Sequence, residues 1–313
     1  MPTTPSAPVV VSSTPAVSAT QKYIAMGVNG HDGKAPYPME TIESRFKVLD
    51  ANNLRSYRTS GEMLNDQRYS EMDTLLALAK KYNINIRPMV YPTTQARAYE
   101  YGKRYGASMK IWEIGNELDL TEGDDAQDYA AMVATYKGLK QASDEFGYNL
   151  KYTINATACN DDAPGRCYGK KDGSIYFLDG AKAAGFNFDY ISFHYYSFYG
   201  DKGYWYDKFY GQMRGMATKY KTKIFYNEMN CAEIYGANGN KDGGFAGDKA
   251  CYDSLKQMIT TINTSYKDIV QEMNIYELLD EPGHEIEWEK HFGLMYDINN
   301  PKPLFNMVTS FTK

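Results

Sequence analysis

The chain has 313 residues, of which 43% are hydrophobic and 14% aromatic, and its formal net charge is −5. This length fits one large domain or two ordinary ones, with ample hydrophobic content for a core. The mild negative charge argues against a surface for nucleic acid or anionic membranes, and no uninterrupted apolar run approaches the roughly 20 residues of a membrane-spanning helix.

The first 21 residues are rich in Pro, Ser, Thr, Ala and Val. They lack the basic start and the long apolar segment of an intact signal peptide. We interpret residues 1–21 as a flexible linker exposed when an export signal or anchor was removed, with Met1 as an added start. On this interpretation the protein is secreted or periplasmic.

From Lys22 onward, short apolar runs alternate with stretches whose apolar residues have helical spacing. We expect strands at 23–27, 54–59, 85–90, 111–115, 151–155, 190–194, 223–226 and 275–279. We expect helices at 39–51, 69–82, from Asp124 or Asp125 to about 146, and at about 174–184, 206–220, 248–262 and 303–311.

Eight strand–helix repeats predict a parallel sheet with crossover helices, closed as a (β/α)₈ TIM barrel that occupies residues 22–313 as one domain. An open doubly wound sheet is the alternative. Such a sheet often begins with a Gly-rich phosphate turn, and no GxGxxG follows the first expected strand. The pattern therefore favours the barrel.

Two of the expected strands end in the same dipeptide. Asn116-Glu117 follows the run 111–115, and Asn227-Glu228 follows the run 224–226. The active sites of TIM barrels lie at the carboxyl ends of the strands, so both glutamates are expected just past strands 4 and 7, at one mouth. Two facing carboxylates are what glycoside hydrolysis requires, one protonated for the leaving oxygen and one ionised to attack the anomeric carbon.

The four cysteines bracket two loops. Cys159 and Cys167 lie eight positions apart, Cys231 and Cys251 enclose a Gly- and Asn-rich segment, and neither pair has the CxxC spacing of a metal site. We predict two local disulfides, 159–167 and 231–251, which would stiffen the walls of the cleft and fit an exported protein. The alternative is four unpaired cysteines in a cytosolic enzyme.

The segment Trp112-Glu113-Ile114-Gly115-Asn116-Glu117 resembles the strand-4 signature of clan A glycoside hydrolases related to families 39, 51 and 79, with Leu118 in place of the usual Pro. The segment 276–282 followed by 292–294 looks like strand 8 of family-39-like hydrolases, including those encoded with bacterial exopolysaccharide synthesis. The resemblance covers the chain from Lys22 to the C-terminus and implies a barrel with one catalytic Glu after strand 4 and another after strand 7.

The resemblance also implies individual roles. Glu117 would be the general acid and later the base, for which it needs a raised pKa, and Asn116 would bind a substrate hydroxyl. Glu228 would be the nucleophile of a retaining mechanism. Arg58 resembles the clan's strand-2 Arg, which keeps the nucleophile ionised. His194 and Tyr196 resemble the clan's strand-6 His and Tyr, which flank the nucleophile.

The position of the strand-2 arginine has an alternative in Arg55. A shift of three residues along a strand changes the face, so only one of Arg55 and Arg58 can point into the barrel; we favour Arg58. A salt-bridged structural role is the competing interpretation for this arginine, as is a structural role for His194.

Aromatic residues suggest where sugar rings could stack. The chain has 29 Tyr, and residues 193–210 contain ten Tyr, Phe or Trp residues. Trp205 and Trp288 follow strands 6 and 8 on the mouth side, so either could be a stacking platform, whereas Trp112 lies within a strand and is expected in the core. Glu281 is a further candidate for substrate contact.

The sequence thus predicts a secreted, monomeric, retaining endo-β-glycosidase that cleaves a polysaccharide and needs no cofactor or metal. An exo-acting enzyme on oligosaccharides is the near alternative, and a carbohydrate-binding barrel without turnover is another. A barrel lyase or aldolase would require a Schiff-base Lys at a strand end or a phosphate loop after strands 7 and 8. The segment after strand 7 shows no phosphate turn.

Overall fold

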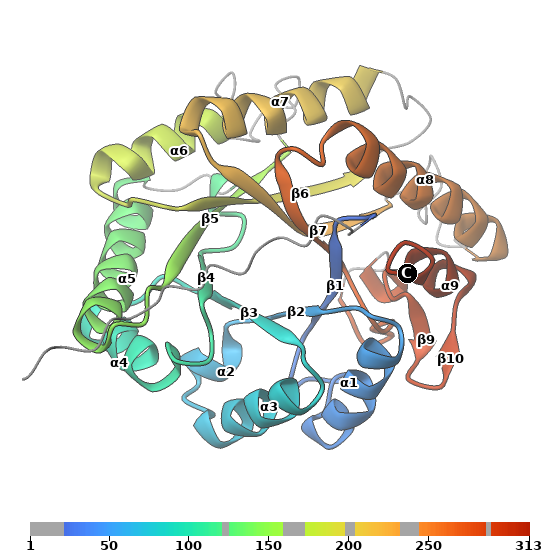
Figure 1. Cartoon of the computed structure of the whole chain (residues 1–313), viewed down its shortest axis with the longest axis horizontal. Coiled ribbons are helices and arrows are strands. Elements are labelled where there is room, and N and C mark those ends of the chain that lie inside the picture. The colour runs from blue at the N-terminus through green and yellow to red at the C-terminus, as the bar shows by residue number, and fades with distance from the viewer. Residues whose placement is uncertain (1–21, 121–124, 159–172, 198–203, 232–243, 286–288) are drawn as a thin grey trace, which may run out of the picture.

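The computed structural model describes residues 22–120, 125–158, 173–197, 204–231, 244–285 and 289–313. Eight parallel strands form a closed barrel in the order β1 to β8, with β1 paired to both β2 and β8. Figure 1 looks along the barrel and shows the helices in a ring outside the strands. The predicted (β/α)₈ barrel is therefore confirmed.

The strands of the barrel are β1 (Ala25–Gly30), β2 (Ser56–Thr59), β3 (Asn85–Val90), β4 (Ile111–Ile114), β5 (Lys151–Thr157), β6 (Tyr190–Ser197), β7 (Lys223–Cys231) and β8 (Val270–Ile275). The outer helices are α1 (Ile42–Ala51), α2 (Glu62–Asn65), α3 (Tyr69–Lys81), α4 (Gln95–Tyr105), α5 (Asp125–Phe146), α6 (Gly173–Ala184), α7 (Tyr204–Tyr220), α8 (Gly244–Ser265) and α9 (Pro303–Thr309). Short elements complete this part of the chain: η1 (Met39–Thr41), η2 (Leu118–Leu120), η5 (Glu289–His291), and the hairpin of β9 (Met295–Asp297) and β10 (Asn300–Pro301).

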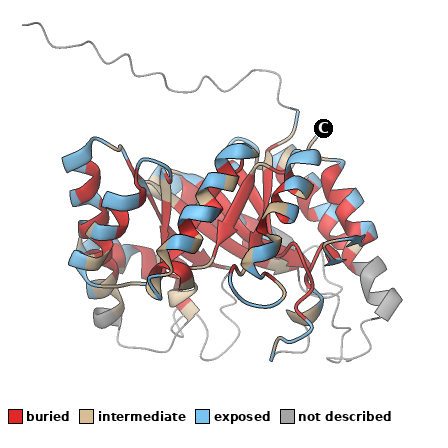
Figure 2. Cartoon of the chain, turned by 90° about the horizontal axis from the view of Figure 1, so that it is seen from below, coloured by how far each residue is buried: buried red, intermediate tan, exposed pale blue. Residues whose placement is uncertain are grey.

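The main hydrophobic core lies between the strands and the surrounding helices. Figure 2 shows buried strands enclosed by helices whose outer faces are exposed. Trp112 and Ile114 on β4 are fully buried in this core, and the indole nitrogen of Trp112 donates to the carbonyl oxygen of Met109 at 2.9 Å. Side chains alternate along a strand, so the intervening Glu113 points toward the barrel axis.

The interior of the barrel is unusually polar. At its amino-terminal end, Glu272 on β8 accepts from the hydroxyl of Ser56 at 2.6 Å and from Arg87 at 2.7 and 3.0 Å. All three side chains come from different strands and point inward. Ion pairs and hydrogen bonds across the axis therefore connect strands that are not neighbours.

The predicted position of the eighth strand is wrong. We expected it at 275–279, but β8 spans Val270–Ile275, and the apolar residues that follow belong to the segment beyond the strand. Glu272 and Asn274 interrupt the apolar pattern of the true strand, because both face the polar interior and are paired there. A search for apolar runs is misled by a strand of this kind.

Helices α2 and α4 and the β9–β10 hairpin were not predicted. Helix α4 is mostly polar, and it packs against α5 through a small residue. A Cβ added at Gly102 would lie 2.8 Å from the Cβ of Ala142. The buried residues Ala98, Tyr101, Gly102 and Tyr105 have regular helical spacing, but most other residues of α4 are polar, and the sequence analysis missed the helix for that reason.

The predicted disulfide between Cys231 and Cys251 is present and joins the end of β7 to α8. Both cysteines are fully buried. The other predicted pair, Cys159 and Cys167, lies outside the described residues, as does the expected linker 1–21.

Within the described residues, no helix combines the length and apolar character needed to cross a membrane.

Candidate functional site

An irregularity in β7 brings two consecutive side chains to the barrel interior. The register of β7 against β6 shifts between Ser192, which lies beside Phe225, and His194, which lies beside Glu228. A bulge of this kind re-aims side chains, so Asn227 and Glu228 both reach the interior. Glu228 therefore lies within β7, not just past the strand as expected.

The end of β4 presents Glu117 through two left-handed backbone positions. Gly115 has φ +85° and Glu117 has φ +51°, a region that residues other than glycine rarely occupy. The backbone nitrogen of Glu117 donates to Oδ1 of Asn155 on β5 at 2.6 Å, which fixes this turn. Held in this way, the Glu117 side chain is 33% exposed at the mouth of the barrel.

Arg58 on β2 is the centre of the polar network at this end of the barrel. Its Nη1 donates to Oε1 of Glu228 at 3.0 Å, and its Nη2 donates to Oδ1 of Asn116 at 2.8 Å. Its Nε and Nη2 also bind the two carboxylate oxygens of Glu113 at 3.0 and 2.9 Å. Arg55 points to the outside and pairs with Asp50, so Arg58 is the strand-2 arginine that faces the barrel.

His194 on β6 joins the two predicted catalytic glutamates. Its Nδ1 lies 2.9 Å from Oε2 of Glu228 and 3.1 Å from Oε1 of Glu117. One carboxylate oxygen of each glutamate and the histidine nitrogen all lie within 4.8 Å of one another. The two carboxyl groups are therefore close enough to act on one glycosidic bond without a water between them.

The charges around Glu228 determine its ionisation. Burial alone would raise the pKa of Glu228, but the neighbouring His194 and Arg58 lower it to about 2. Burial disfavours the charged form of His194 as well, yet Glu228 and the other carboxylates raise its pKa well above the usual value. Both shifts favour an ion pair between an anionic Glu228 and a protonated His194.

Glu113 is a site residue to which the sequence analysis gave no role. It is 2% exposed and accepts a hydrogen bond from Nδ2 of Asn227 at 2.7 Å in addition to its two bonds from Arg58. Arg58 and His194 lower its pKa to about 2 against the effect of burial. A charged residue between Trp112 and Ile114 in an apolar strand was the available signal.

Asp119 lies directly behind the β4 turn and was also not predicted. Its Oδ2 accepts from the backbone nitrogen of Thr157 at 2.7 Å and from the Thr157 hydroxyl at 3.0 Å. Burial raises the pKa of Asp119 to about 6, with the Glu117 charge adding to the effect and the Thr157 hydrogen bonds opposing it. These bonds tie the turn that presents Glu117 to the end of β5.

Aromatic side chains line the side of the mouth near β6 and β8. The ring centroid of Tyr196 lies 5.1 Å from that of Phe292 and 6.1 Å from that of Tyr276. Of the predicted stacking residues, Trp205 lies in the first turn of α7, where its side chain is not described, and Trp288 lies outside the described residues. Glu281 lies beyond β8, with its Oε1 3.5 Å from Nδ1 of His31.

Two groups of side chains in the described part of the chain have the donor atoms and spacing for a metal ion. One is the set Glu117, His194 and Glu228, and the other is the set His31, Glu277 and Glu281. In the first group, the guanidinium of Arg58 already provides a cation beside Glu228. A hydrolytic role for this group needs only proton transfer by one carboxyl group and attack by the other as a carboxylate.

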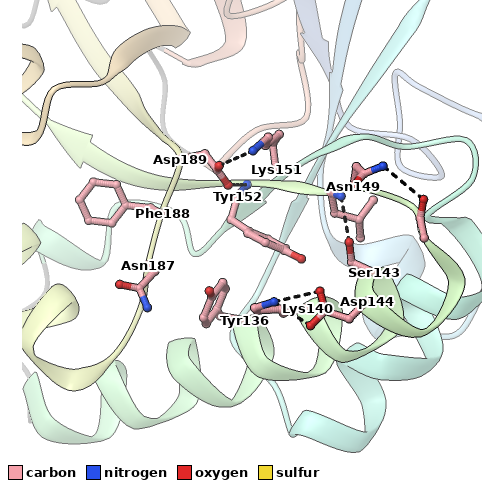
Figure 3. Close-up of a pocket in the computed structure, with 12 residues that line it drawn as sticks. Tyr136, Lys140, Ser143, Asp144, Asn149, Lys151, Tyr152, Asn187, Phe188 and Asp189 are labelled. Atoms are coloured by element: carbon pink, nitrogen blue, oxygen red, sulfur yellow. Dashed lines mark hydrogen bonds and ion pairs between the residues drawn. The ribbon is translucent and has the colours of Figure 1, made fainter. Parts of the chain in front are cut away.

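A cavity of about 620 Å³ lies at the opposite end of the barrel. It is bounded by the end of α5 and by the residues that lead into β5 and β6, including Tyr136, Tyr152 and Asp189 (Figure 3). Lys151 pairs with Asp189 at 2.7 Å, and Lys140 pairs with Asp144 at 2.7 Å. None of the predicted site residues lines this cavity, because they gather at the carboxyl ends of the strands.

The chain matches no family model, and no curated protein matches it in sequence. Its fold is similar to those of several solved glycoside hydrolases. The crystal structure of CbXyn10B in native form superposes with a TM-score of 0.63 at 12% identity, covering 93% of this chain and 97% of that one.

Two further proteins of similar structure are described as an endo-β-1,3-glucanase and an endo-laminarinase. A GH128 (subgroup II) endo-β-1,3-glucanase from Pseudomonas viridiflava has a TM-score of 0.61 at 16% identity, covering 92% of this chain and 98% of that one. An endo-laminarinase from Formosa Hel1_33_131 has a TM-score of 0.57 at 17% identity, covering 93% and 88%. At these identities, the similarity shows a TIM-barrel fold shared with glycoside hydrolases.

Proposed function

We propose that this protein is a retaining β-glycosidase that cleaves a polysaccharide internally by double displacement. The observation that carries the proposal is the pairing of Glu117 and Glu228 across His194, with carboxylate oxygens within 4.8 Å. Retaining enzymes hold their carboxyl groups roughly 5–5.5 Å apart, whereas inverting enzymes leave about 6.5–9.5 Å for a water molecule. This separation supports direct attack by a carboxylate.

Glu228 has the environment of a nucleophile. It is 7% exposed and is held by Arg58 and His194, which keep it ionised. An anionic oxygen aimed into the mouth can attack an anomeric carbon and form a glycosyl–enzyme intermediate. The Arg58 contact also fixes the orientation of the Glu228 carboxylate, so less entropy is lost when the reacting atoms are brought into line.

Glu117 is suited to proton transfer. It is more exposed than Glu228, it faces the same histidine, and its position is fixed by the Asn155 bond to its backbone. In the first step it would protonate the leaving oxygen, and in the second it would take a proton from water. Asn116, held by Arg58, would bind a substrate hydroxyl next to the scissile bond.

The substrate class rests on two kinds of support. Solved structures with a similar fold are described as a β-1,3-glucanase, a laminarinase, a mannosidase and a protein in complex with xylotriose. The aromatic wall of Tyr196, Tyr276 and Phe292 offers ring faces on which sugars stack. The affiliation with family-39-like exopolysaccharide hydrolases rests on the sequence motifs alone.

Export belongs to the same proposal. The buried Cys231–Cys251 disulfide supports an oxidising compartment, since disulfides are rare in the cytosol. We propose that the enzyme acts as a secreted or periplasmic monomer.

The test is a time course of product size on β-glucans, xylans, mannans and bacterial exopolysaccharides. We expect falling polymer length and a ladder of oligosaccharides, reduced below about 1% of the wild-type rate in Glu228→Gln. Glu145→Gln, which removes an exposed charge on α5, is the control and should retain full activity. NMR of the first product should show the β-anomer.

Other outcomes favour the alternatives. Monosaccharide alone from the first minutes indicates an exo-acting enzyme. Glycan binding by the wild-type protein with no turnover on any polymer indicates a binding barrel. Activity above about 1% in Glu228→Gln would show that the nucleophile is misassigned.

A further inference from the structure

A second cluster of donor atoms lies where the barrel closes between β1 and β8. His31 follows β1 directly, and Glu277 and Glu281 follow β8. The two strands are parallel neighbours, so these residues meet at the same edge of the mouth. One histidine nitrogen and one oxygen from each carboxylate lie within 4.8 Å of one another.

Glu277 is buried, and the hydroxyl of Tyr37 is its hydrogen-bonding neighbour. Its side chain is 0% exposed, and by strict hydrogen-bond geometry neither carboxyl oxygen has a partner among the described residues. The hydroxyl of Tyr37 interacts with Glu277, but it has a single hydrogen and also lies 3.2 Å from the oxygen of Leu279, while it accepts from the Leu279 nitrogen at 2.8 Å. Burying a carboxyl group in this state is costly unless it is protonated or a ligand satisfies it.

Three basic side chains that lie near this cluster in the chain have acidic partners of their own. Lys34 binds Glu62 at 2.8 Å, and Lys302 binds Asp280 at 2.6 Å. His284 lies 3.2 Å from Glu289. Within the part of the chain that the structure describes, His31 lies 3.5 Å from Glu281 and within 4.8 Å of a carboxyl oxygen of Glu277.

We propose that His31, Glu277 and Glu281 bind one divalent cation of the Zn²⁺ or Mn²⁺ type. One imidazole nitrogen and two carboxylate oxygens are ligands that these ions accept, whereas a hard ion such as Ca²⁺ prefers oxygen alone. With bonds of roughly 2.0–2.2 Å, three donors within this distance of one another can surround a single ion after small side-chain rotations.

An adjacent cavity gives the site a path to solvent. It has a volume of about 360 Å³ and is lined by Lys34, Ala35, Glu281, Gly283, His284 and Glu285. Water from this side can complete the coordination, and a metal ion can enter without unfolding the barrel. A bound cation would balance the two carboxylates and would join the end of β1 to the segment after β8.

The experiment is a calorimetric titration of EDTA-treated, tag-free protein with ZnCl₂ and with MnCl₂. We expect one equivalent of at least one metal to bind, with a rise in melting temperature. Glu277→Gln and Glu281→Gln should each weaken metal binding at least tenfold. Losing a residue that only hydrogen-bonds a metal ligand already lowers metal affinity about 10–100-fold, and these two residues are proposed as ligands themselves. Glu285→Gln, an exposed glutamate beside the same cavity, should bind as the wild type does.

Three results would overturn the proposal. One is the absence of stoichiometric binding for both metals. Another is unchanged metal affinity in Glu281→Gln. If circular dichroism shows that Glu277→Gln does not fold, the result for Glu281→Gln is sufficient by itself. The third is loss of binding in Glu228→Gln, which would place the ion between the two catalytic candidates.

Discussion

Glu228 and Glu277 are buried carboxylic acids at the same mouth of one barrel, but their neighbours carry different charges. Arg58 and His194 surround Glu228 and hold its pKa at about 2 despite burial. Burial raises the pKa of Glu277 well above its usual range, and the nearby charge of Glu281 adds to this effect. Cationic neighbours, more than depth, therefore decide which carboxyl is ionised and available as a nucleophile.

The strongest test of this difference removes the cation. Arg58→Met leaves Glu113 and Glu228 buried without their guanidinium partner. We expect the free energy of unfolding to fall by about 3–5 kcal/mol, because breaking a buried pair leaves an uncompensated charge, and turnover to be lost. Urea denaturation and a polysaccharide assay measure the two effects.

Arg55→Met is the matched control for this experiment. Arg55 lies three residues earlier and pairs with Asp50 on the surface, where both side chains are about a third or more exposed. Exposed pairs contribute about 0–1 kcal/mol. Equal losses of stability in the two variants would mean that the Arg58 network does not hold the mouth together.

Glu113→Gln tests whether the third carboxylate positions Arg58. The change keeps the shape of the side chain but removes the charge that binds two guanidinium nitrogens. We expect kcat to fall about 10–100-fold with little change in KM, because a misplaced Arg58 no longer orients Glu228. Steady-state kinetics on the polymer that the product-size time course identifies as a substrate provide the measurement.

The interior offers a matched control for Glu113 as well. Glu272 is also a buried glutamate bound to an arginine, but it lies at the far end of the barrel with Arg87. Glu272→Gln should lose stability while kcat stays near the wild-type value. A similar fall of kcat in both variants would indicate a general loss of rigidity and would contradict a positioning role.

The pH profile of activity tests the charge around Glu228. A nucleophile must be ionised, so the acid limb of kcat/KM follows its pKa and should lie below about pH 4. In His194→Gln, the loss of a cation that lowers this pKa should move the acid limb to higher pH. His291→Gln, on an exposed histidine, should leave the limb in place; an unmoved limb in His194→Gln would contradict the assignment.

The fold could be predicted because most strands keep a recognisable apolar pattern. Strand β8 is the exception, since Glu272 and Asn274 face a polar barrel interior that cannot be recognised from the sequence pattern. Helix α4 was missed although its buried residues have helical spacing, because its composition is mostly polar. In β8, tertiary contacts outweigh the local pattern.

The candidate site was predicted in part. Glu117, Glu228, Arg58 and His194 come from four strands, and the order of strands in a barrel is enough to gather them at one mouth. The role of Glu113 depends on distances across the barrel axis, which spacing along the chain does not contain. The meeting of His31 with Glu277 follows from the closure of β1 on β8 and from the true end of β8, which was misplaced.

The smallest expected effect separates the two sides of the mouth. Glu281→Gln and Glu228→Gln are the same chemical change, but Glu228 is bound by Arg58 at 3.0 Å whereas Glu281 has His31 at 3.5 Å. In EDTA at pH 7, we expect Glu281→Gln to alter the free energy of unfolding by less than about 1 kcal/mol, since no buried guanidinium loses its partner. Glu228→Gln should cost more, because it leaves Arg58 and His194 with one negative charge fewer. If urea denaturation gives the same loss for both, the charge surroundings of the two carboxylates differ less than their contacts indicate.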